Sequence, residues 1–429
     1  MSEAGLPARA AALEILGEVL RKRRPLDAAL DEILPRAALD ARDAGFARAI
    51  ASETLRRFGQ LDALIHAFIA KPPAPHRSGP TLEILLAGAC ELLFLDVASH
   101  AAVDAANKLA AADKKAVHFK PLINATLRRI AREGRAALAA QDAERLNTSD
   151  WLWTRWCESY GEDVARAIAR AHAARPMLDI VRKDNGFEIP GAVAMPGHML
   201  RLADGGRVDD IVGYAQGAWW VQDFAAHLPA RLLGDVRGKT VIDLCAAPGG
   251  KTAQLTASGA QVIAVEREPA RMARLKENLD RLQLPAALVE ANALDYQPDA
   301  PAPFVLLDAP CSATGTIRRH PELPWIKSAA DINTCVATAA ELLDAAAAMV
   351  APGGLLVFAV CSLEPEEGAE QIADFLSRGE SFARVPVAES ELFGLKELIS
   401  PAGDLRTLPC HLAEQGGMDG FYAARLRRL

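Results

Sequence analysis

A tight, glycine-rich turn between a short apolar strand and a helix constrains this chain more than any other feature. The turn reads Cys-Ala-Ala-Pro-Gly-Gly-Lys over residues 245–251 and follows an expected buried strand at 240–244. Backbone N–H groups in such a turn, at the N-terminus of a helix, point at a bound ligand. A second expected strand, 261–266, ends in Glu266, and an acid at that position accepts hydrogen bonds from ribose hydroxyls. The pattern predicts a nucleotide or nucleoside site in an α/β domain.

Two familiar phosphate-binding motifs do not fit this turn. Gly250-Lys251-Thr252 resembles the end of a P-loop, but that motif needs a glycine where this chain has Cys245, and GxGxxG is absent as well. The Asp-Leu-Cys-Ala-Ala-Pro-Gly-Gly-Lys-Thr form instead resembles the S-adenosylmethionine loop of class I methyltransferases, in particular that of RNA (cytosine-5) methyltransferases. The resemblance implies S-adenosylmethionine as methyl donor; an ordinary tight strand-to-helix turn is the alternative.

The chain, at 429 residues, is long enough for two or three domains. Apolar residues at helical spacing predict an all-α domain over residues 1–140. Short β-like pieces separated by Gly and Asp predict a small α/β linker module over 141–235. From 236 to 429, strands alternate with helices, which predicts a Rossmann-like, doubly wound parallel sheet. The expected strands of that sheet are residues 240–244, 261–266, 286–290, 303–308, 354–359 and 420–425.

The helical domain resembles the NusB fold, an RNA-binding helical domain. The residues that carry the resemblance are Asp43, Arg48, Leu55–Arg57, Leu85–Gly88, His100–Asp104 and Asn124–Arg129. The resemblance implies an RNA-binding face. Arg128, Arg129 and Arg132 cluster enough to indicate phosphate contacts, with a solvated helix face as the alternative.

Two cysteines follow neighbouring apolar strands of the expected sheet. Cys311 comes after Asp308-Ala-Pro, Cys361 comes after the strand at 354–359, and a serine directly follows each cysteine. The ligand crevice of an open α/β sheet lies at the carboxyl ends of its strands, so both thiols, Asp308 and the donor turn are expected to converge there. A single cysteine is more often an inert buried thiol, but two Cys-Ser pairs placed in this way indicate chemistry.

The reactivity of cytosine explains why thiols would be needed. C5 of cytosine is a poor nucleophile, and addition of a thiolate to the adjacent ring carbon converts the base into an enamine-like species that accepts a methyl cation. The thiolate needs a lowered pKa, and an acid supplies a proton or hydrogen bond on the N3 side of the base. A base then removes the C5 proton, and the thiol leaves by elimination. Two thiols and one carboxylate suit these steps.

The resemblance to RNA (cytosine-5) methyltransferases assigns the roles. It makes Cys361 the nucleophile, Cys311 the residue that assists elimination and product release, and Asp308 the group that orients or protonates the cytosine. DNA cytosine-5 enzymes use a Pro-Cys nucleophile instead, so Cys311 is the competing candidate. Lys251 is expected near either the donor carboxylate or the base.

The same resemblance places the methyl donor. The expected contacts are Cys245, Ala246, Ala247, Pro248, Gly249, Gly250 and Lys251 around the methionine part, Glu266 at the ribose, Asn292 at the adenine edge, and Asp308. Asn292, Val360 and Gly368 depart from the family pattern, where Asp, Thr and Asn are usual. Because the nucleophile is retained, activity is expected.

A basic loop follows the first cysteine. Arg318, Arg319 and His320 are expected to hold RNA phosphates beside the crevice, where the target cytosine must be flipped out to reach a buried thiol. A surface loop whose arginines pair with nearby acids is the alternative.

Composition narrows the class of protein. No run of 18 apolar residues exists, the start lacks a signal pattern, and the seven cysteines form no CxxC or Cys/His cluster. We therefore expect no membrane span, no metal, and reduced thiols in the cytoplasm. A net charge of −7 argues against a surface that coats nucleic acid as a whole. Residues 1–140 nevertheless carry 20 Lys and Arg against 16 Asp and Glu, which allows a local RNA-binding face.

A NusB-like domain joined to a cytosine-5 RNA methyltransferase domain resembles the RsmB (Sun/Fmu) family over nearly the whole chain. The resemblance implies methylation of one cytosine of 16S ribosomal RNA, with no obligate protein partner. The same chemistry on tRNA or another ribosomal site is an alternative, which the helical domain disfavours. A non-catalytic RNA-binding factor is another, which the retained Cys311, Asp308 and Cys361 disfavour. A small-molecule methyltransferase would need neither the thiol pair nor the basic loop.

Overall fold

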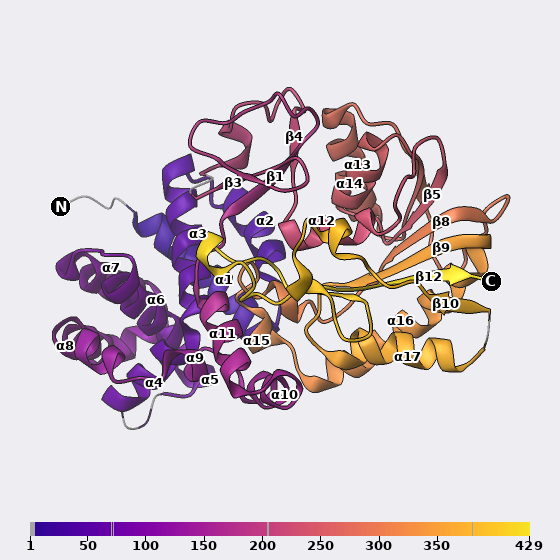
Figure 1. Ribbon diagram of the computed structural model, residues 1–429. Helices are drawn as coiled ribbons and strands as arrows, with labels where there is room; N and C mark the ends of the chain where they lie inside the picture. The colour runs from indigo at the N-terminus through magenta and orange to yellow at the C-terminus, as the bar shows by residue number, and fades with distance from the viewer. Residues whose placement is uncertain (1–4, 70, 72, 204–205, 380) are drawn as a thin grey trace. The chain divides into compact units, whose positions relative to one another are not determined.

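The computed structural model describes residues 5–69, 71, 73–203, 206–379 and 381–429 (Figure 1). The chain divides into two compact units. The first contains the residues up to Ala174 together with Ile317–Ser328, and the second contains Arg175–Thr316 and Ala329–Leu429. The first unit therefore extends past the boundary expected near residue 140. It also takes in a segment from within the sequence of the C-terminal domain.

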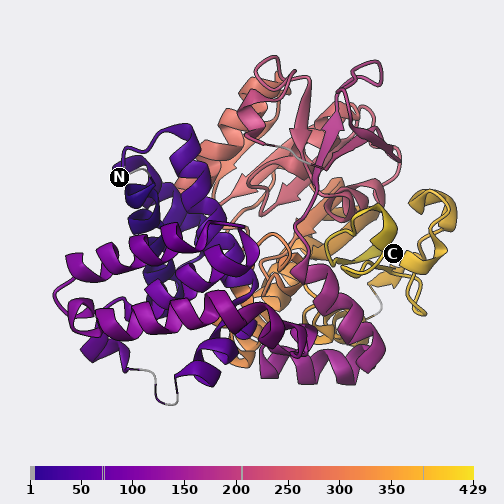
Figure 2. The same ribbon diagram turned by 90° about the vertical axis from the view of Figure 1, so that its left-hand side faces the viewer.

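The first unit is a bundle of helices, most of which run from indigo to magenta in Figure 2. They are α1 (Leu6–Lys22), α2 (Leu26–Arg36), α3 (Ala41–Arg56), α4 (Phe58–Phe68), α5 (Pro75–Ser78), α6 (Thr81–Phe94), α7 (Ser99–Ala112), α8 (Lys120–Ala139), α9 (Ala143–Leu146), α10 (Asp150–Tyr160), α11 (Glu162–Ala173) and α15 (Leu323–Ile326). Helix α6 is buried along nearly its whole length, as an all-round apolar sequence requires. At Gly88, an added Cβ would lie 2.8 Å from Cδ1 of Leu127, so the glycine lets α8 pack closely against α6. The all-helical bundle predicted from the sequence is confirmed.

The segment Ile317–Ser328 is held in the first unit by directional contacts. Arg56, which is buried, donates from Nη1 to the carbonyl oxygen of Arg318 at 2.7 Å. Trp325 donates from Nε1 to the carbonyl oxygen of Leu55 at 3.0 Å. These side chains satisfy main-chain acceptors that no helix or sheet ladder would otherwise serve. The segment is thus fixed to the end of α3 although more than 250 residues separate them in sequence.

The second unit contains two sheets. The smaller is antiparallel with strand order β2-β3-β1-β4, and the larger has eight strands in the order β10-β12-β9-β8-β5-β6-β7, with β11 paired to β12. Neighbours from β9 to β7 pair in parallel, whereas β12 is antiparallel to β9. The strands are β1 (Leu178–Arg182), β2 (Val193–Met195), β3 (Met199–Leu202), β4 (Trp219–Val221), β5 (Thr240–Leu244), β6 (Gln261–Glu266), β7 (Ala287–Glu290), β8 (Ala302–Asp308), β9 (Val350–Val360), β10 (Phe382–Arg384), β11 (Leu405–Arg406) and β12 (Tyr422–Arg428). The Rossmann-like sheet is confirmed.

Helices cover both faces of the larger sheet (Figure 1). They are α12 (Phe224–Arg231), α13 (Gly250–Ala257), α14 (Pro269–Leu282), α16 (Ala329–Met349) and α17 (Ala369–Ser377). Leu306 and Val357 belong to the apolar cluster with α12, α13 and α14, whereas Val305 and Leu356 belong to the cluster with α16 and α17. Successive strand residues thus enter opposite cores, which explains why β8 and β9 are continuous apolar runs.

The described part of the chain contains neither a membrane-spanning helix nor a metal-binding group of side chains. None of its helices is long and apolar enough to cross a membrane. No three of its His, Cys, Asp or Glu side chains are grouped so that they could hold a metal ion.

Replacing Arg56 with Ala tests how far the segment Ile317–Ser328 contributes to stability. The change leaves the carbonyl oxygens of Arg318 and His172 without their buried donor. Each unsatisfied buried acceptor costs roughly 1–3 kcal/mol, so we expect the free energy of unfolding to fall by about 2 kcal/mol or more in urea titrations. Arg36→Ala, which removes an exposed ion pair with Glu14, is the control and should change it by less than about 1 kcal/mol. Equal effects of the two substitutions would contradict a stabilising role for the hydrogen bonds of Arg56.

Candidate active site

The turn after β5 is a cradle built from small residues in unusual backbone conformations. Cys245 and Gly249 both have positive φ, of 59° and 104°. At Gly249 an added Cβ would also lie 2.5 Å from Cδ1 of Leu275 in α14, so only glycine fits there. Helix α13 begins at the next residue, Gly250, and the N–H groups of its first turn have no partner within the helix. The turn therefore offers main-chain donors to a ligand at the carboxyl end of β5.

Polar side chains stand at the ends of the next two strands. Glu266 ends β6 and is 2% exposed; its Oε1 accepts from the N–H of Glu268 at 3.1 Å and its Oε2 from the N–H of Ala247 at 3.3 Å. A carboxylate has about four acceptor sites, so Glu266 can still accept from ribose hydroxyls. Asn292 follows β7 and is half-buried. The cradle, the carboxylate and the amide thus fit the methionine, ribose and adenine parts of S-adenosylmethionine.

Asp243 lies beneath the cradle, inside β5. It is fully buried, and its Oδ2 accepts from Oγ1 of Thr252 at 2.6 Å, whereas its Oδ1 has no hydrogen-bond partner. Burial raises the pKa of the Asp243 carboxyl to about 7, against the lowering effect of the Thr252 hydrogen bond. The carboxyl is therefore close to half-protonated near neutral pH.

The two strands that precede the cysteines are adjacent and parallel. Asp308, the last residue of β8, is in register with Ala359 of β9. The chain continues from these strand ends to Cys311 and Cys361, whose sulfur atoms lie 3.5 Å apart. Lys251 Nζ lies 2.7 Å from Oδ2 of Asp308, so Lys251 pairs with the carboxylate that was expected to face the base. The structure brings both thiols and the Asp308–Lys251 pair to one edge of the sheet, as the sequence predicted.

The two thiols have different surroundings. The hydrogen bond with Cys361 raises the pKa of the Cys311 thiol well above its ordinary value, and burial and the charge of Glu367 raise it further. Cys311 is therefore a protonated thiol at neutral pH. A protonated thiol is a weak nucleophile but can donate to a neighbouring sulfur.

A buried carboxylate, Glu367, joins the loops that carry the two cysteines. Its Oε1 accepts from the N–H of Ser312 at 2.7 Å, and its Oε2 accepts from the hydroxyls of both Ser312, at 2.5 Å, and Ser362. Ser312 and Ser362 directly follow Cys311 and Cys361, and Glu367 is only 1% exposed. Glu367 thus joins the two loops, together with the main-chain hydrogen bond from Gly315 to the carbonyl oxygen of Cys361 at 3.0 Å.

Sequence reasoning missed this residue. Glu367 lies in the run Glu366-Glu-Gly-Ala-Glu370, which drew attention only because Gly368 departs from the family pattern. A run of acids is normally a solvated surface. The available signal was the pair of serines after the two cysteines, since buried hydroxyls need acceptors.

The structure also gives a reason for Gly368. An added Cβ there would lie 3.0 Å from the ring of Tyr422 and 3.1 Å from a guanidinium nitrogen of Arg406. Arg406 in turn donates to the carbonyl oxygen of Ser362 at 2.7 Å. A larger residue at 368 would displace a side chain that supports the loop of Cys361. Glycine is therefore compatible with an intact active site.

The basic loop after Cys311 differs from the expectation at one position. Arg318 is 2% exposed, because its segment packs within the first unit, so its guanidinium does not lie on a surface where it could contact phosphate. Arg319 is exposed, and His320 is half-buried with Nδ1 3.7 Å from a carboxylate oxygen of Asp27. Only the second and third residues of the expected Arg-Arg-His trio remain candidates for RNA.

The other candidate RNA-binding residues lie on the surface of α8. Arg128 is exposed and donates to the side-chain oxygen of Asn124 at 3.3 Å. Arg129 is exposed, pairs with Glu133 at 2.8 Å, and stacks over the ring of Phe68. Both guanidinium groups are accessible within the first unit, although Arg129 would have to share its charge with Glu133.

The fold and the site together define a class I, S-adenosylmethionine-dependent methyltransferase with an N-terminal helical domain of the NusB type. The family described as "16S rRNA methyltransferase RsmB/F" matches residues 230–427, and the NusB family matches residues 6–132. The chain belongs to the RsmB/F family of 16S rRNA methyltransferases and is an rRNA methyltransferase.

Relatives match the chain over nearly its full length. A protein of Pseudomonas putida named "Ribosomal RNA small subunit methyltransferase B" is 34% identical over 98% of both chains. A protein of the same name from Vibrio cholerae is 33% identical over 98% of this chain and 97% of its own. Among solved structures, PH0851 superposes with a TM-score of 0.76 and 23% identity over the whole of both chains. NSun6 from Pyrococcus horikoshii, solved with SFG, gives a TM-score of 0.55 and 17% identity over 65% of this chain and 98% of its own.

Removing the Glu367 carboxylate should slow methyl transfer without weakening donor binding. Glu367→Ala removes the acceptor of three buried donors and loosens the connection between the two cysteine loops. A displacement of about 1 Å costs on the order of a hundredfold in rate, so we expect kcat to fall by about that factor while the donor Kd changes less than about twofold. Glu367→Gln keeps an acceptor and should lose about tenfold. Exposed Glu370→Ala is the control; an equal loss in it, or unchanged kcat in Glu367→Ala, would rule out the positioning role.

Asp243→Asn should make stability less dependent on pH. The folded pKa of about 7 exceeds the value of roughly 3.9 in unfolded chains. Wild-type protein therefore has the full contribution of this group below about pH 4 and loses it as the pH rises through 7. We expect the variant and wild type to have similar free energies of unfolding at pH 4.5, and the variant to be the more stable at pH 8, by urea titration. A constant difference across this range would contradict the raised pKa.

Proposed function

We propose that this rRNA methyltransferase transfers the methyl group of S-adenosylmethionine to C5 of a cytosine in 16S ribosomal RNA, through a covalent bond between Cys361 and the base. The observation that carries the proposal is the pair of sulfur atoms 3.5 Å apart at the ends of β8 and β9, beside Asp308. Two thiols and a carboxylate at the crevice of a methyltransferase sheet match the needs of cytosine C5. The names of the relatives, which specify the small ribosomal subunit, support 16S RNA as the substrate.

The first steps depend on Cys361 and Asp308. The Cys361 thiolate adds to C6 of the cytosine, which makes C5 nucleophilic. Lys251, paired with Oδ2 of Asp308, holds that carboxylate in one orientation, and Asp308 contacts the N3 side of the base. When bound, S-adenosylmethionine supplies an electrophilic methyl group. Cys245 to Lys251, Glu266 and Asn292 hold the donor so that this methyl group faces C5.

Product release depends on Cys311. After a base removes the C5 proton, the bond between C6 and the Cys361 sulfur breaks and the electron pair returns to that sulfur. Cys311, held as a protonated thiol beside it, donates a hydrogen bond to the departing thiolate. The raised pKa of Cys311 supports this division of roles, because a nucleophile would need the opposite shift.

Four residues of the first unit are proposed to contact RNA. Arg319 and His320 follow the catalytic loop in sequence, and Arg128 and Arg129 lie on α8. Contacts with phosphate would position the RNA without reading its sequence. Arg318 is left out of this set because it is buried.

A methyl-transfer assay with three RNAs tests the proposal. Labelled S-adenosylmethionine is mixed with unmodified 16S RNA, with tRNA, and with assembled small subunits. We expect 5-methylcytosine in 16S RNA or the subunits, a loss of at least about a thousandfold with Cys361→Ala, and an RNA adduct that persists on denaturing gels with Cys311→Ala.

The outcomes separate the alternatives. Label found only in tRNA would mean that tRNA, and not 16S RNA, is the substrate. Label that survives Cys361→Ala but not Cys311→Ala would mean that Cys311 is the nucleophile and that the proposed roles of the two thiols are reversed. Donor binding without label in any RNA would favour a non-catalytic RNA-binding factor.

A further inference from the structure

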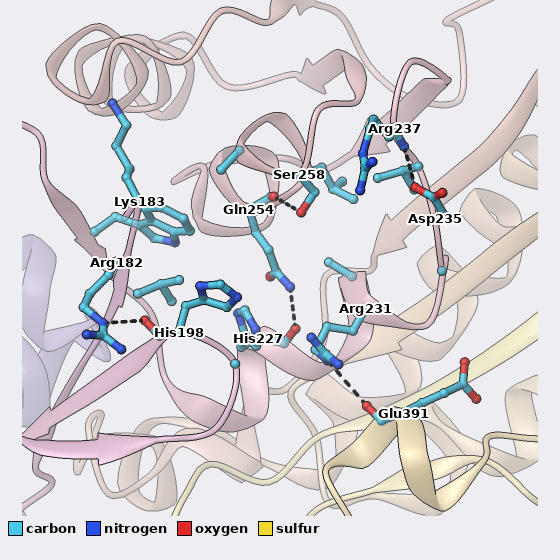
Figure 3. Close-up of a pocket in the computed structure, with 18 of the residues that line it drawn as sticks. Arg182, Lys183, His198, His227, Arg231, Asp235, Arg237, Gln254, Ser258 and Glu391 are labelled. Carbon is cyan, nitrogen blue, oxygen red and sulfur yellow. Dashed lines mark hydrogen bonds between the residues drawn. The ribbon is translucent and has the colours of Figure 1, made fainter. Parts of the chain in front are cut away.

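A second cavity of the methyltransferase unit lies away from the cysteines and the donor turn (Figure 3). It has a volume of about 570 Å³ and is lined by residues of the small sheet, of α12, of the C-terminal end of α13 and of the chain before β5. Asp235 and Arg237 precede β5 in sequence, whereas the donor turn follows that strand. The cavity is therefore at the amino end of the sheet, opposite to the active site.

Positive charge gathers around this cavity. Arg182, Lys183, Arg231 and Arg237 line it, against the carboxylates of Asp235 and Glu391. The Glu391 carboxylate is itself engaged by Arg425, whose Nη1 lies 2.6 Å from Oε1. The cavity thus has an excess of cations in a protein whose net charge is −7.

None of these cations forms an ion pair with a carboxylate among the described residues, although the charge of Glu391 acts on Arg231. Arg182 donates to the carbonyl oxygens of Asn185, Phe187 and His198. Arg231 donates from Nε to the carbonyl oxygen of Glu391 and stacks on the ring of Phe393. The Arg237 guanidinium is exposed and makes no hydrogen bond or ion pair within the described chain. Other arginines of the described chain, such as Arg9 with Glu91 and Arg201 with Asp179, form an ion pair with an acid.

The partial negative charges at two helix C-termini offset only part of this positive charge. Arg231 lies in the last turn of α12, and Arg237 lies near the end of α13, where main-chain carbonyls carry partial negative charge. Each helix end contributes about half an elementary charge at most. The carbonyls of Gln254, Leu255 and Thr256 at the end of α13 already accept from the main chain. Two helix ends therefore leave the cavity with unmatched positive charge.

Polar side chains lie beside the arginines in the lining of this cavity. Figure 3 shows Ser258, Gln254 and His198 around the same space as Arg231 and Arg237. Burial lowers the pKa of His227 to about 3, so this lining residue is neutral. The Ser258 hydroxyl donates to the carbonyl oxygen of Gln254 at 2.8 Å, and the Gln254 amide donates to that of His227 at 2.9 Å. The guanidinium groups therefore remain as the donors for a ligand, and they suit phosphate better than a metal ion or an apolar ligand.

We propose that this cavity binds a phosphate group through Arg231 and Arg237, carried either by the backbone of the RNA substrate or by a free nucleotide. The RNA source rests on the function proposed above, whereas the nucleotide source does not. Helix α13, eight residues long, spans from the donor turn to this cavity, a distance of about 12 Å. Phosphate bound here is thus separate from the donor and does not compete with it.

The test compares wild type with a variant carrying Arg231→Gln and Arg237→Gln. RNA binding is measured by filter binding with 16S RNA over a range of salt concentrations, and nucleotide binding by calorimetry with AMP and with inorganic phosphate. For RNA phosphate we expect the slope of log K against log salt to become shallower by about 0.7–0.9, because that is the contribution of one phosphate contact. For a free ligand we expect AMP or phosphate to bind wild type and to lose at least tenfold in affinity in the variant.

A matched variant removes the same charge elsewhere in the unit. Arg378→Gln with Arg427→Gln changes two exposed arginines away from the cavity, and it should leave the salt slope and AMP binding as in wild type. Arg237→Gln alone, which breaks no internal contact, guards against misfolding of the double variant. Unchanged S-adenosylmethionine affinity confirms that the sheet is intact.

Three results are decisive. A reduced slope, or lost AMP or phosphate binding, confined to the cavity variants supports the proposal. Wild-type levels of RNA, AMP and phosphate binding in both cavity variants overturn it, whether or not the protein methylates 16S RNA. If no RNA is methylated but AMP or phosphate binds and the cavity variants abolish that binding, the proposed function fails and the phosphate site stands.

Discussion

The contact between the sulfur atoms of Cys311 and Cys361 is the constraint on which the active site depends. Parallel pairing of β8 and β9 brings two strand ends together, and beyond them only a few main-chain bonds, such as Gly315 N–H to the carbonyl oxygen of Cys361, link the loops. Glu367 takes over at that point, because its two oxygens bind the residues that follow both cysteines. A cation in its place would lower thiol pKa values, whereas a carboxylate raises that of Cys311. One buried side chain thus helps to align the two thiols and adds to the raised pKa of Cys311.

Features with a local cause could be predicted from the sequence. Strands β5 and β6 have the predicted bounds, 240–244 and 261–266, because their apolar residues and the flanking turn residues define them. The convergence of the donor turn, Asp308 and both cysteines also followed from a general rule, since parallel strands present their carboxyl ends at one edge. Gly249 belongs to this group, because its positive φ favours glycine and the glycine is visible in the sequence.

Features that depend on distant segments could not be predicted. Arg318, Arg319 and His320 are similar in sequence, yet only Arg318 is buried, and its burial depends on α3 and its partner Arg56. No pattern near residue 318 reports that contact. The same holds for Glu367, whose acidic neighbourhood resembles a solvated surface until the two serines that bind it are placed in space. Residues 317–328 likewise belong to the helical unit only through contacts with residues far earlier in the chain.

One helix, α13, runs between the two ends of the methyltransferase sheet and influences the charges at both. Helix α13 directs its N-terminal amides toward the donor turn, so the carboxylate of a bound donor needs no additional cation there, and Lys251 is free to pair with Asp308. The carboxyl end of the same helix carries the opposite partial charge, which stabilises cations such as Arg237 without a carboxylate. Unmatched cations near a protein surface cost little while water solvates them, and they gain strongly from a phosphate. The orientation of α13 therefore favours an anionic ligand at the donor turn and stabilises part of the positive charge at the opposite edge.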